Sequence, residues 1–410
     1  MDEAAPLHRS RSKPAKDEVD RCWRVAIIAA LATFVTMAAF KSSGVIFVEV
    51  MTEFGISREE AAWPTSASAA ALNSAGMVVQ LLQKRISLVR IMLIGSVLVW
   101  AGLVASAFTT SIVGISLTYG AIYGPGNGIM IVILVTIVMA YFDKYRGIAN
   151  GIRFLGETCS GVAFPYLLLH LREAYDFQGM LLILGSITMH TTAFTIALKE
   201  PRWARQRLNK EGTAASSTSR KLRPSEDSHS GIPSKASSNT ATNATETPTS
   251  PCATLLNPVF YIIVTSSAIC HYSHIVFMTT IVDYGKDRGS PLVRATSVVV
   301  YSSATDIIGH LVLPLLADRN YLRRSSLVMG CHMLLGLSMM LLPHVYSFTW
   351  LLINSSCVTM LISCMLTMKA VLMADYLGLE YISACYGATG LVSLPLNLTA
   401  PLVVGKLLRI

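Results

Sequence analysis

The stretch Tyr141-Phe142-Asp143-Lys144-Tyr145-Arg146-Gly147-Ile148-Ala149-Asn150-Gly151 decides how the chain folds. It places a short charged bend between two long apolar runs, 111–140 and 148–169. A run of about 20 apolar residues is what an α-helix needs to cross the hydrocarbon core of a bilayer. The stretch is therefore predicted to connect two membrane-spanning helices.

The pattern of apolar run and polar connection continues on both sides of this bend. The 410 residues are 52% hydrophobic and only 14% charged, whereas soluble domains carry about 25% charged residues. The mean hydropathy is +0.53. We expect an all-α integral membrane protein with about eleven transmembrane helices, at 25–47, 62–82, 88–108, 111–140, 148–169, 180–198, 258–281, 295–316, 325–343, 347–373 and 385–405.

The formal charge of +9 is distributed unevenly. Lys and Arg gather in the amino-terminal tail and in alternate connections, which is the pattern of a membrane protein that keeps positive loops inside the cell. This places the amino terminus in the cytoplasm and argues against nucleic acid as a partner. The lipid bilayer is the environment that the pattern requires.

A change of composition divides the chain. Residues 205–254 are rich in Ser, Thr, Ala, Asn and Pro and have almost no aromatic side chains, so they lack the apolar surface for a packed core. We predict a cytoplasmic basic tail at 1–24, a six-helix bundle at 25–200, a disordered cytoplasmic loop at 201–256 and a five-helix bundle at 257–410.

Several motifs resemble those of one transporter family. They are the Tyr-Phe bend at 141–151, the glycine-rich segment from Gly120 to Gly128, and the helix end Lys41-Ser42-Ser43-Gly44-Val45-Ile46-Phe47-Val48-Glu49. On these residues the chain resembles the monocarboxylate transporter family of the major facilitator superfamily, as a divergent, arthropod-like member. The resemblance implies two helical bundles with a substrate site between them near the bilayer midplane. It also implies a twelfth helix, which this chain is expected to lack.

The function that the resemblance implies is secondary active transport. The expected substrates are small monocarboxylates of the lactate and pyruvate kind, carried with a proton by alternating access in the plasma membrane. A single-pass, immunoglobulin-like ancillary subunit is a further partner that the resemblance suggests. No catalytic residue, cofactor or metal site is expected, because His271 and His274 stand without further ligands and favour helix packing or pore lining.

Charges inside the predicted spans are the candidate site residues, because a charge in the bilayer core is costly. Lys41 matches a lysine of lactate-carrying relatives and is predicted to bind the substrate carboxylate, the alternative being an ammonium that reaches the outer headgroups. Asp306 and His310 lie four residues apart on one helix face and form a candidate proton-coupling pair. A structural hydrogen bond between these two is the alternative.

Arg153 and Glu157 are also four residues apart. One alternative is a structural ion pair between them. The other is that Arg153 binds substrate and replaces the arginine that the family carries in its eighth span, which corresponds to 295–316 and lacks that arginine here. Glu157 and Arg146 are candidate gating residues, and Arg146 has simple cytoplasmic placement as its alternative. Lys369 is expected near the cytoplasmic end of its span, with its ammonium reaching the headgroups.

Two other functions remain open from the sequence. His310 stands where the family has an arginine, which favours an uncoupled facilitator of other organic or aromatic acids. The expected absence of a twelfth helix favours a non-transporting, truncated isoform.

Overall fold

The computed structural model describes residues 22–83, 85–142, 145–198, 258–319, 321–377 and 382–407. Every regular element within these ranges is a helix. The predicted loop at 201–256 and most of the predicted tail at 1–24 lie outside the described residues.

The described helices fall into an amino-terminal half and a carboxyl-terminal half. The first half contains α1 (Trp23–Thr36), α2 (Ala38–Lys41), α3 (Ser43–Phe54), α4 (Arg58–Ala61), α5 (Trp63–Leu82), α6 (Leu88–Ala107), α7 (Ile112–Ile115), the π-helix η2 (Ser116–Tyr123), α8 (Gly124–Tyr141), α9 (Arg146–Thr188) and α10 (His190–Ala197). The second contains α13 (Pro258–Asp287), α14 (Leu292–Ile307), the π-helix η3 (Ile308–Val312), α15 (Leu313–Asp318), α16 (Arg324–Leu341), the 3-10 turn η4 (Leu342–His344), α17 (Phe348–Leu377) and α18 (Ile382–Leu407).

The helices coincide with the predicted spans. Eight helical segments of the described chain are long and apolar enough to cross a membrane. One of them, 146–197, holds two predicted spans, because Tyr175 and Asp176 leave helical geometry and bend the chain there. Together with α5 and the segment α1–α3, these segments match all eleven predicted apolar runs.

The first span is longer and more broken than its apolar run at 25–47 predicted. Turns at Met37 and Ser42 divide it into α1, α2 and α3, which end only at Phe54. Lys41 therefore lies near the middle of this span, whereas the apolar run at 25–47 puts it near one end.

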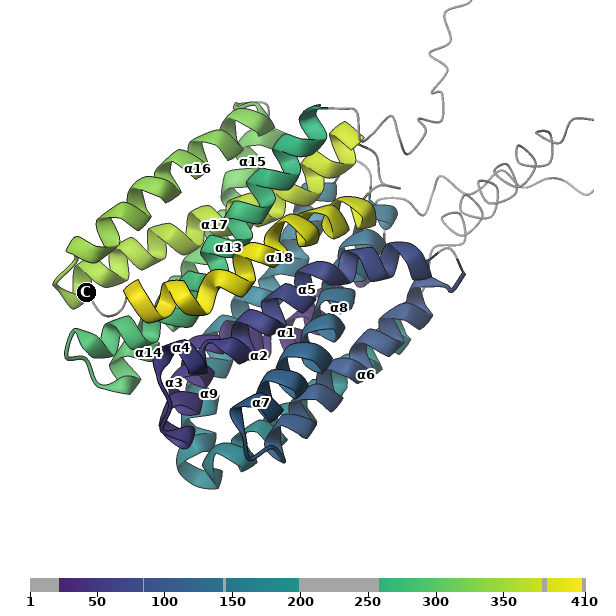
Figure 1. Ribbon diagram of the computed structural model, residues 1–410. Helices are drawn as coiled ribbons and strands as arrows, with labels where there is room; N and C mark the ends of the chain where they lie inside the picture. The colour runs from purple at the N-terminus through teal and green to yellow at the C-terminus, as the bar shows by residue number, and fades with distance from the viewer. Residues whose placement is uncertain are drawn as a thin grey trace, which may run out of the picture.

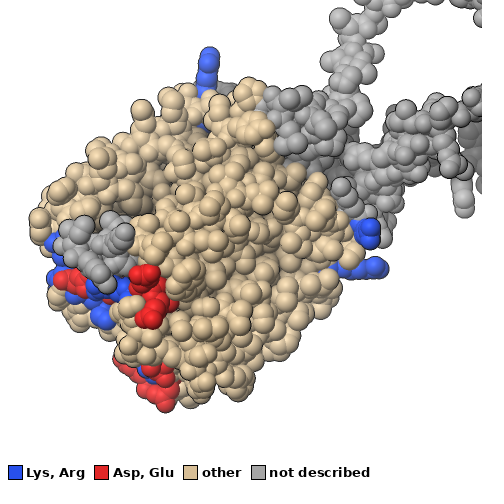
Figure 2. All heavy atoms as spheres, in the orientation of Figure 1, with Lys and Arg blue, Asp and Glu red and all other residues tan. Residues whose placement is uncertain are grey.

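The surface between the two ends of the helices is apolar. Figure 2 shows Lys, Arg, Asp and Glu side chains at the ends of the molecule and an uncharged band between them. The outer face of α16 contributes Met329, Met333, Leu337 and Met340, each more than half exposed. Such a surface marks an aggregation hazard in water but suits contact with lipid tails.

The two halves lie side by side, with α5 against α18 in the middle of the view (Figure 1). Further contacts between the halves are made by α9 with α14 and by α3 with α13. Small residues allow this close approach. A Cβ atom on Gly390 would lie 2.0 Å from the Asn73 carbonyl oxygen, and one on Gly76 would lie 2.5 Å from the Gly387 nitrogen.

We expect Gly390→Ala to reduce the thermal stability of the purified protein, because the added methyl group meets rigid backbone of α5. The matched control is Gly336→Ala, since a Cβ there meets nothing within 4 Å. Unfolding midpoints in detergent measure both effects. Equal midpoints for the two variants would show that the α5–α18 contact is not tight in solution.

Candidate functional site

A buried ion network joins the two halves at the centre of the molecule. The Lys41 Nζ atom lies 2.9 Å from Asp306 Oδ2 and 3.3 Å from Glu157 Oε1. Lys41 comes from α2 and Glu157 from α9, whereas Asp306 comes from α14 of the other half. All three side chains are at most 7% exposed, so this cation is shared by two carboxylates away from water.

This network explains the position of Lys41 and excludes one predicted alternative. A lysine that reaches the headgroups would expose its ammonium, but the Lys41 side chain is only 2% exposed. A lysine with two carboxylate partners is not free for a substrate, so a substrate that binds Lys41 must displace one of them. The substrate-binding role of Lys41 stays a prediction.

Arg153 does not pair with Glu157, and the predicted structural ion pair is wrong. The Arg153 Nε atom donates to Asn150 Oδ1 at 3.0 Å, and the guanidinium lies 3.8 Å from the centre of the Phe154 ring. Its Nη2 atom is buried without a hydrogen-bond partner among the described residues. Arg153 therefore keeps one buried donor without a partner, which is compatible with the alternative that this side chain binds substrate.

Asp306 and His310 contact different partners. The His310 Nδ1 atom lies 2.7 Å from Thr367 Oγ1, and its ring stacks on Phe154 with centroids 4.3 Å apart. The reason is local: His310 lies in the π-helix η3, where the wider turn ends the four-residue spacing of an α-helix. The predicted structural Asp306–His310 hydrogen bond is not formed in the described chain, and their proton-coupling role stays a prediction.

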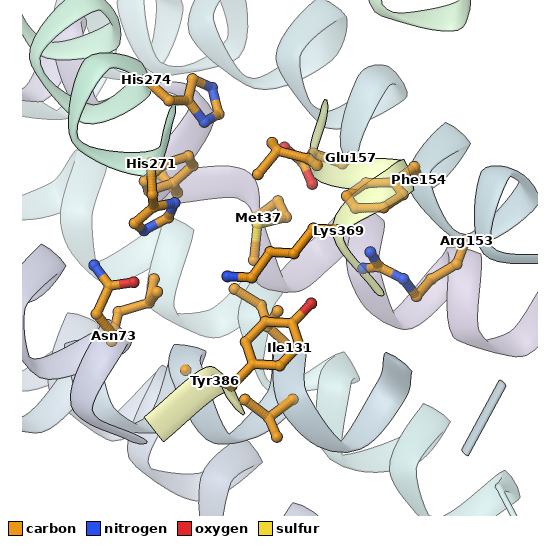
Figure 3. Close-up of a pocket in the computed structure, with 15 residues that line it drawn as sticks. Met37, Asn73, Ile131, Arg153, Phe154, Glu157, His271, His274, Lys369 and Tyr386 are labelled. Atoms are coloured by element: carbon orange, nitrogen blue, oxygen red, sulfur yellow. The ribbon is translucent and has the colours of Figure 1, made fainter. Parts of the chain in front are cut away.

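A cavity of about 60 Å³ lies beside the ion network. Both halves line it: Arg153, Phe154 and Glu157 come from α9, His271 and His274 from α13, Lys369 from α17 and Tyr386 from α18 (Figure 3). Of the two roles that the sequence left open for these histidines, helix packing or pore lining, their place at the cavity wall is compatible with the second. His271 Nε2 and His274 Nδ1 are buried and have no hydrogen-bond partner among the described residues.

The prediction for Lys369 is wrong. Its Nζ atom lies 4.2 Å from the centre of the Tyr386 ring at the cavity wall and does not reach a headgroup region. The predicted span ended at residue 373, but α17 continues to Leu377, so Lys369 lies deeper than the apolar run indicated. Sequence reasoning missed this site residue, although a lysine within an apolar run was the available signal.

Arg146 begins α9 and its Nε atom donates to the Phe142 carbonyl oxygen at 3.1 Å. This bond holds the bend between α8 and α9 within the first half. Its gating role, like that of Glu157, stays a prediction. No group of three or more His, Cys, Asp or Glu side chains in the described ranges is arranged to hold a metal ion.

A second ion bridge joins the halves at one end of the molecule. The Arg58 Nε atom of α4 lies 2.7 Å from Asp283 Oδ2 of α13, and Arg58 also contacts Asp287. Burial acts to lower the pKa of Arg58, but Asp283 and Asp287 raise it above its ordinary value. Beside it, the Ser57 backbone and hydroxyl groups lower the pKa of Glu60, which closes a capping box at the start of α4.

We expect Lys41→Met to destabilise the protein by about 3–5 kcal/mol, because it leaves two buried carboxylates without a cation. Adding Asp306→Asn to this variant removes one of these charges and is expected to recover part of the loss. Unfolding midpoints of the purified variants measure the effect, with Lys286→Met outside the network as control. An unchanged midpoint for Lys41→Met would contradict the role of the network in holding the halves.

Removing the end bridge is expected to loosen one contact between the halves without unfolding either. In Arg58→Ala, amide hydrogen exchange is expected to rise in peptides covering α4 and the last turns of α13. Arg288→Ala is the control, because Arg288 contacts Tyr284 and the Pro343 carbonyl within one half. Equal exchange in both variants would show that the Arg58 bridge does not hold this end closed.

Comparison with known proteins places this architecture. Residues 29–400 match the sequence profile of a family described as "Major Facilitator Superfamily". The chain is similar to Monocarboxylate transporter 6 of Mus musculus, with 29% identity over 43% of this chain and 38% of that protein. It is also similar to Monocarboxylate transporter 4 of Mus musculus, with 32% identity over 41% of this chain and 36% of that protein. The matched segment thus spans little more than a third of each relative's length.

Solved structures show the same arrangement of helices. The xylose transporter XylE from E. coli, in a partially occluded inward open conformation, superposes with a TM-score of 0.64. The match covers 93% of this chain and 90% of that chain at 12% identity, which supports a shared fold alone. Since the profile covers most of the sequence and the fold agrees, the chain belongs to the Major Facilitator Superfamily and is a multi-pass membrane protein.

Proposed function

We propose that the chain carries small monocarboxylates of the lactate and pyruvate kind together with a proton, by alternating access of its two halves. The observation that carries this proposal is the Lys41–Asp306–Glu157 network, which spans both halves beside a cavity lined by Arg153, whose Nη2 atom has no partner among the described residues. The similarity to monocarboxylate transporters over part of the chain supports the same substrate class.

The network offers a way to couple a proton to an anion. A proton on Asp306 removes the charge that holds Lys41 across the two halves. The substrate carboxylate then takes the place of Asp306 beside Lys41, with Arg153 as a second cation. With the proton on Asp306, Lys41 keeps Glu157 as its partner and gains room for the substrate carboxylate. Without the proton, the substrate would bring a third negative charge to an ammonium that two carboxylates already share.

The small cavity, of about 60 Å³, favours short aliphatic acids over the bulkier aromatic acids, which carry a carboxylate in addition to the ring. The basic connections support a cytoplasmic amino terminus. The plasma membrane as location and an immunoglobulin-like ancillary subunit are further parts of the proposal.

Uptake of labelled lactate and pyruvate into oocytes tests the proposal, at external pH of about 6 and about 7.5, with surface protein quantified. We expect uptake per surface molecule to rise at the lower pH. Uptake independent of pH would favour an uncoupled facilitator. No uptake with normal surface levels, with and without an ancillary subunit, would refute transport of these acids.

Asp306→Asn is expected to abolish the rise of uptake at acid pH, because an amide does not take up the proton. Asp375→Asn makes the same chemical change where the side chain pairs with Arg324, away from the cavity, and is expected to keep the pH response. A pH response retained in Asp306→Asn would remove Asp306 from the coupling mechanism.

A further inference from the structure

The cavity and the ion network beside it contain more cations than carboxylates. Arg153, Lys369 and Glu157 line the cavity, and Lys41 and Asp306 complete the network next to it, which gives three cations and two carboxylates. Both carboxylates are held by Lys41, at 3.3 and 2.9 Å. Neither Arg153 nor Lys369 forms an ion pair with a carboxylate among the described residues, although Glu157 is close enough to act on Arg153 electrostatically. The cavity wall therefore carries two cations that no direct ion pair compensates.

The two uncompensated cations come from different halves and point to different parts of the cavity. Arg153 belongs to α9 and lies beside Phe154, whereas Lys369 belongs to α17 of the other half. In Figure 3 the Lys369 ammonium points away from Arg153, toward the side where His271, Asn73 and Tyr386 lie. A ligand with one carboxylate neutralises only one of these two cations.

The surroundings of Lys369 have the chemistry of an anion site. Its ammonium lies over the Tyr386 ring, which is a weaker partner than a carboxylate. His271 adds a buried Nε2 atom without a partner among the described residues, and in one tautomer this atom is a hydrogen-bond donor. Unsatisfied donors at buried positions are costly, and such donors usually have a ligand or water as partner.

We propose that Lys369 and His271 form a second anion subsite, so that the carrier also binds short dicarboxylates such as oxalate, malonate and succinate. One carboxylate of the ligand lies at Arg153 and the other at Lys369. The ligand therefore bridges the two halves. This inference rests on the proposed transport of small organic acids at the same cavity, and it makes Lys369 the residue that distinguishes a dicarboxylate from a monocarboxylate.

Ligand-induced shifts of the unfolding midpoint of the purified full chain test binding without requiring transport. The probes are malonate, and propionate as a monocarboxylate of the same carbon number, at matched ionic strength, together with lactate. We expect all three to stabilise the protein, malonate at a lower concentration than propionate.

Stabilisation by lactate and propionate but not by malonate would overturn the dicarboxylate subsite and leave the proposed function standing. Stabilisation by malonate alone would support the subsite and contradict monocarboxylate transport, and no shift with any probe would overturn both.

Variants of Lys369 then locate the second carboxylate. Lys369→Met is expected to weaken malonate binding at least about tenfold, the effect of one lost charge-assisted hydrogen bond, and to leave lactate binding within about twofold. Lys369→Arg keeps the charge and is expected to retain malonate binding. Lys286→Met, in the last turn of α13 and outside the cavity lining, is the control for the same chemical change. Equal weakening of malonate and lactate in Lys369→Met, or malonate binding unchanged in it, would overturn the assignment. Should Lys369→Met fold poorly, Lys369→Arg and the wild-type comparison of malonate with propionate still decide the proposal.

Discussion

The structure depends on the sharing of one buried ammonium by two carboxylates from different halves. Buried charges are costly unless they are paired, so the ammonium and its two carboxylates depend on keeping this geometry. Close packing of α9 on α14 supports it. A Cβ atom on Gly161 would lie 2.3 Å from Ser303 Oγ and 3.4 Å from Lys41 Cδ, so only a glycine fits here beside Lys41. The relative position of the two halves and the charge state of the network are therefore coupled.

The irregular segments of the helices place the side chains of this centre. Turns at Met37 and Ser42 bring Lys41 to the axis between the halves, and the π-helix η3 turns His310 toward Thr367 and Phe154. Phe154 then lies between the His310 ring and the Arg153 guanidinium, so an aromatic ring separates two groups that both carry positive charge when protonated. Such breaks are tolerated at membrane depth only where protein surrounds the backbone.

The sequence was sufficient to predict the membrane-spanning helices but not the contacts of their charged side chains. Apolar run length depends on bilayer thickness alone, which is why all the predicted runs fall on helices. Their position within apolar runs correctly identified Arg153, Glu157, Asp306 and His310 as interior residues. Their four-residue spacing predicted that each partner lies on the same helix. In the structure, Glu157 and Asp306 instead both contact Lys41, which belongs to a third helix. Partner choice depends on helix rotation and on the broken first span, and neither leaves a signal in residue spacing. Lys369 was misplaced for a related reason, since the end of an apolar run is not the end of its helix.

The two ion bridges between the halves differ in exposure. The Arg58 side chain is 29% exposed, whereas that of its partner Asp283 is 2% exposed, so water reaches only one side of this bridge. In the central network every side chain is at most 7% exposed, and losing one partner there costs about 3–5 kcal/mol. Movement of the halves is therefore limited most strongly by the centre. A proton on Asp306 and an anion beside Lys41 together remove the cost of breaking the central network. Binding of proton and substrate at the cavity therefore controls the movement of the two halves, although the halves also meet elsewhere.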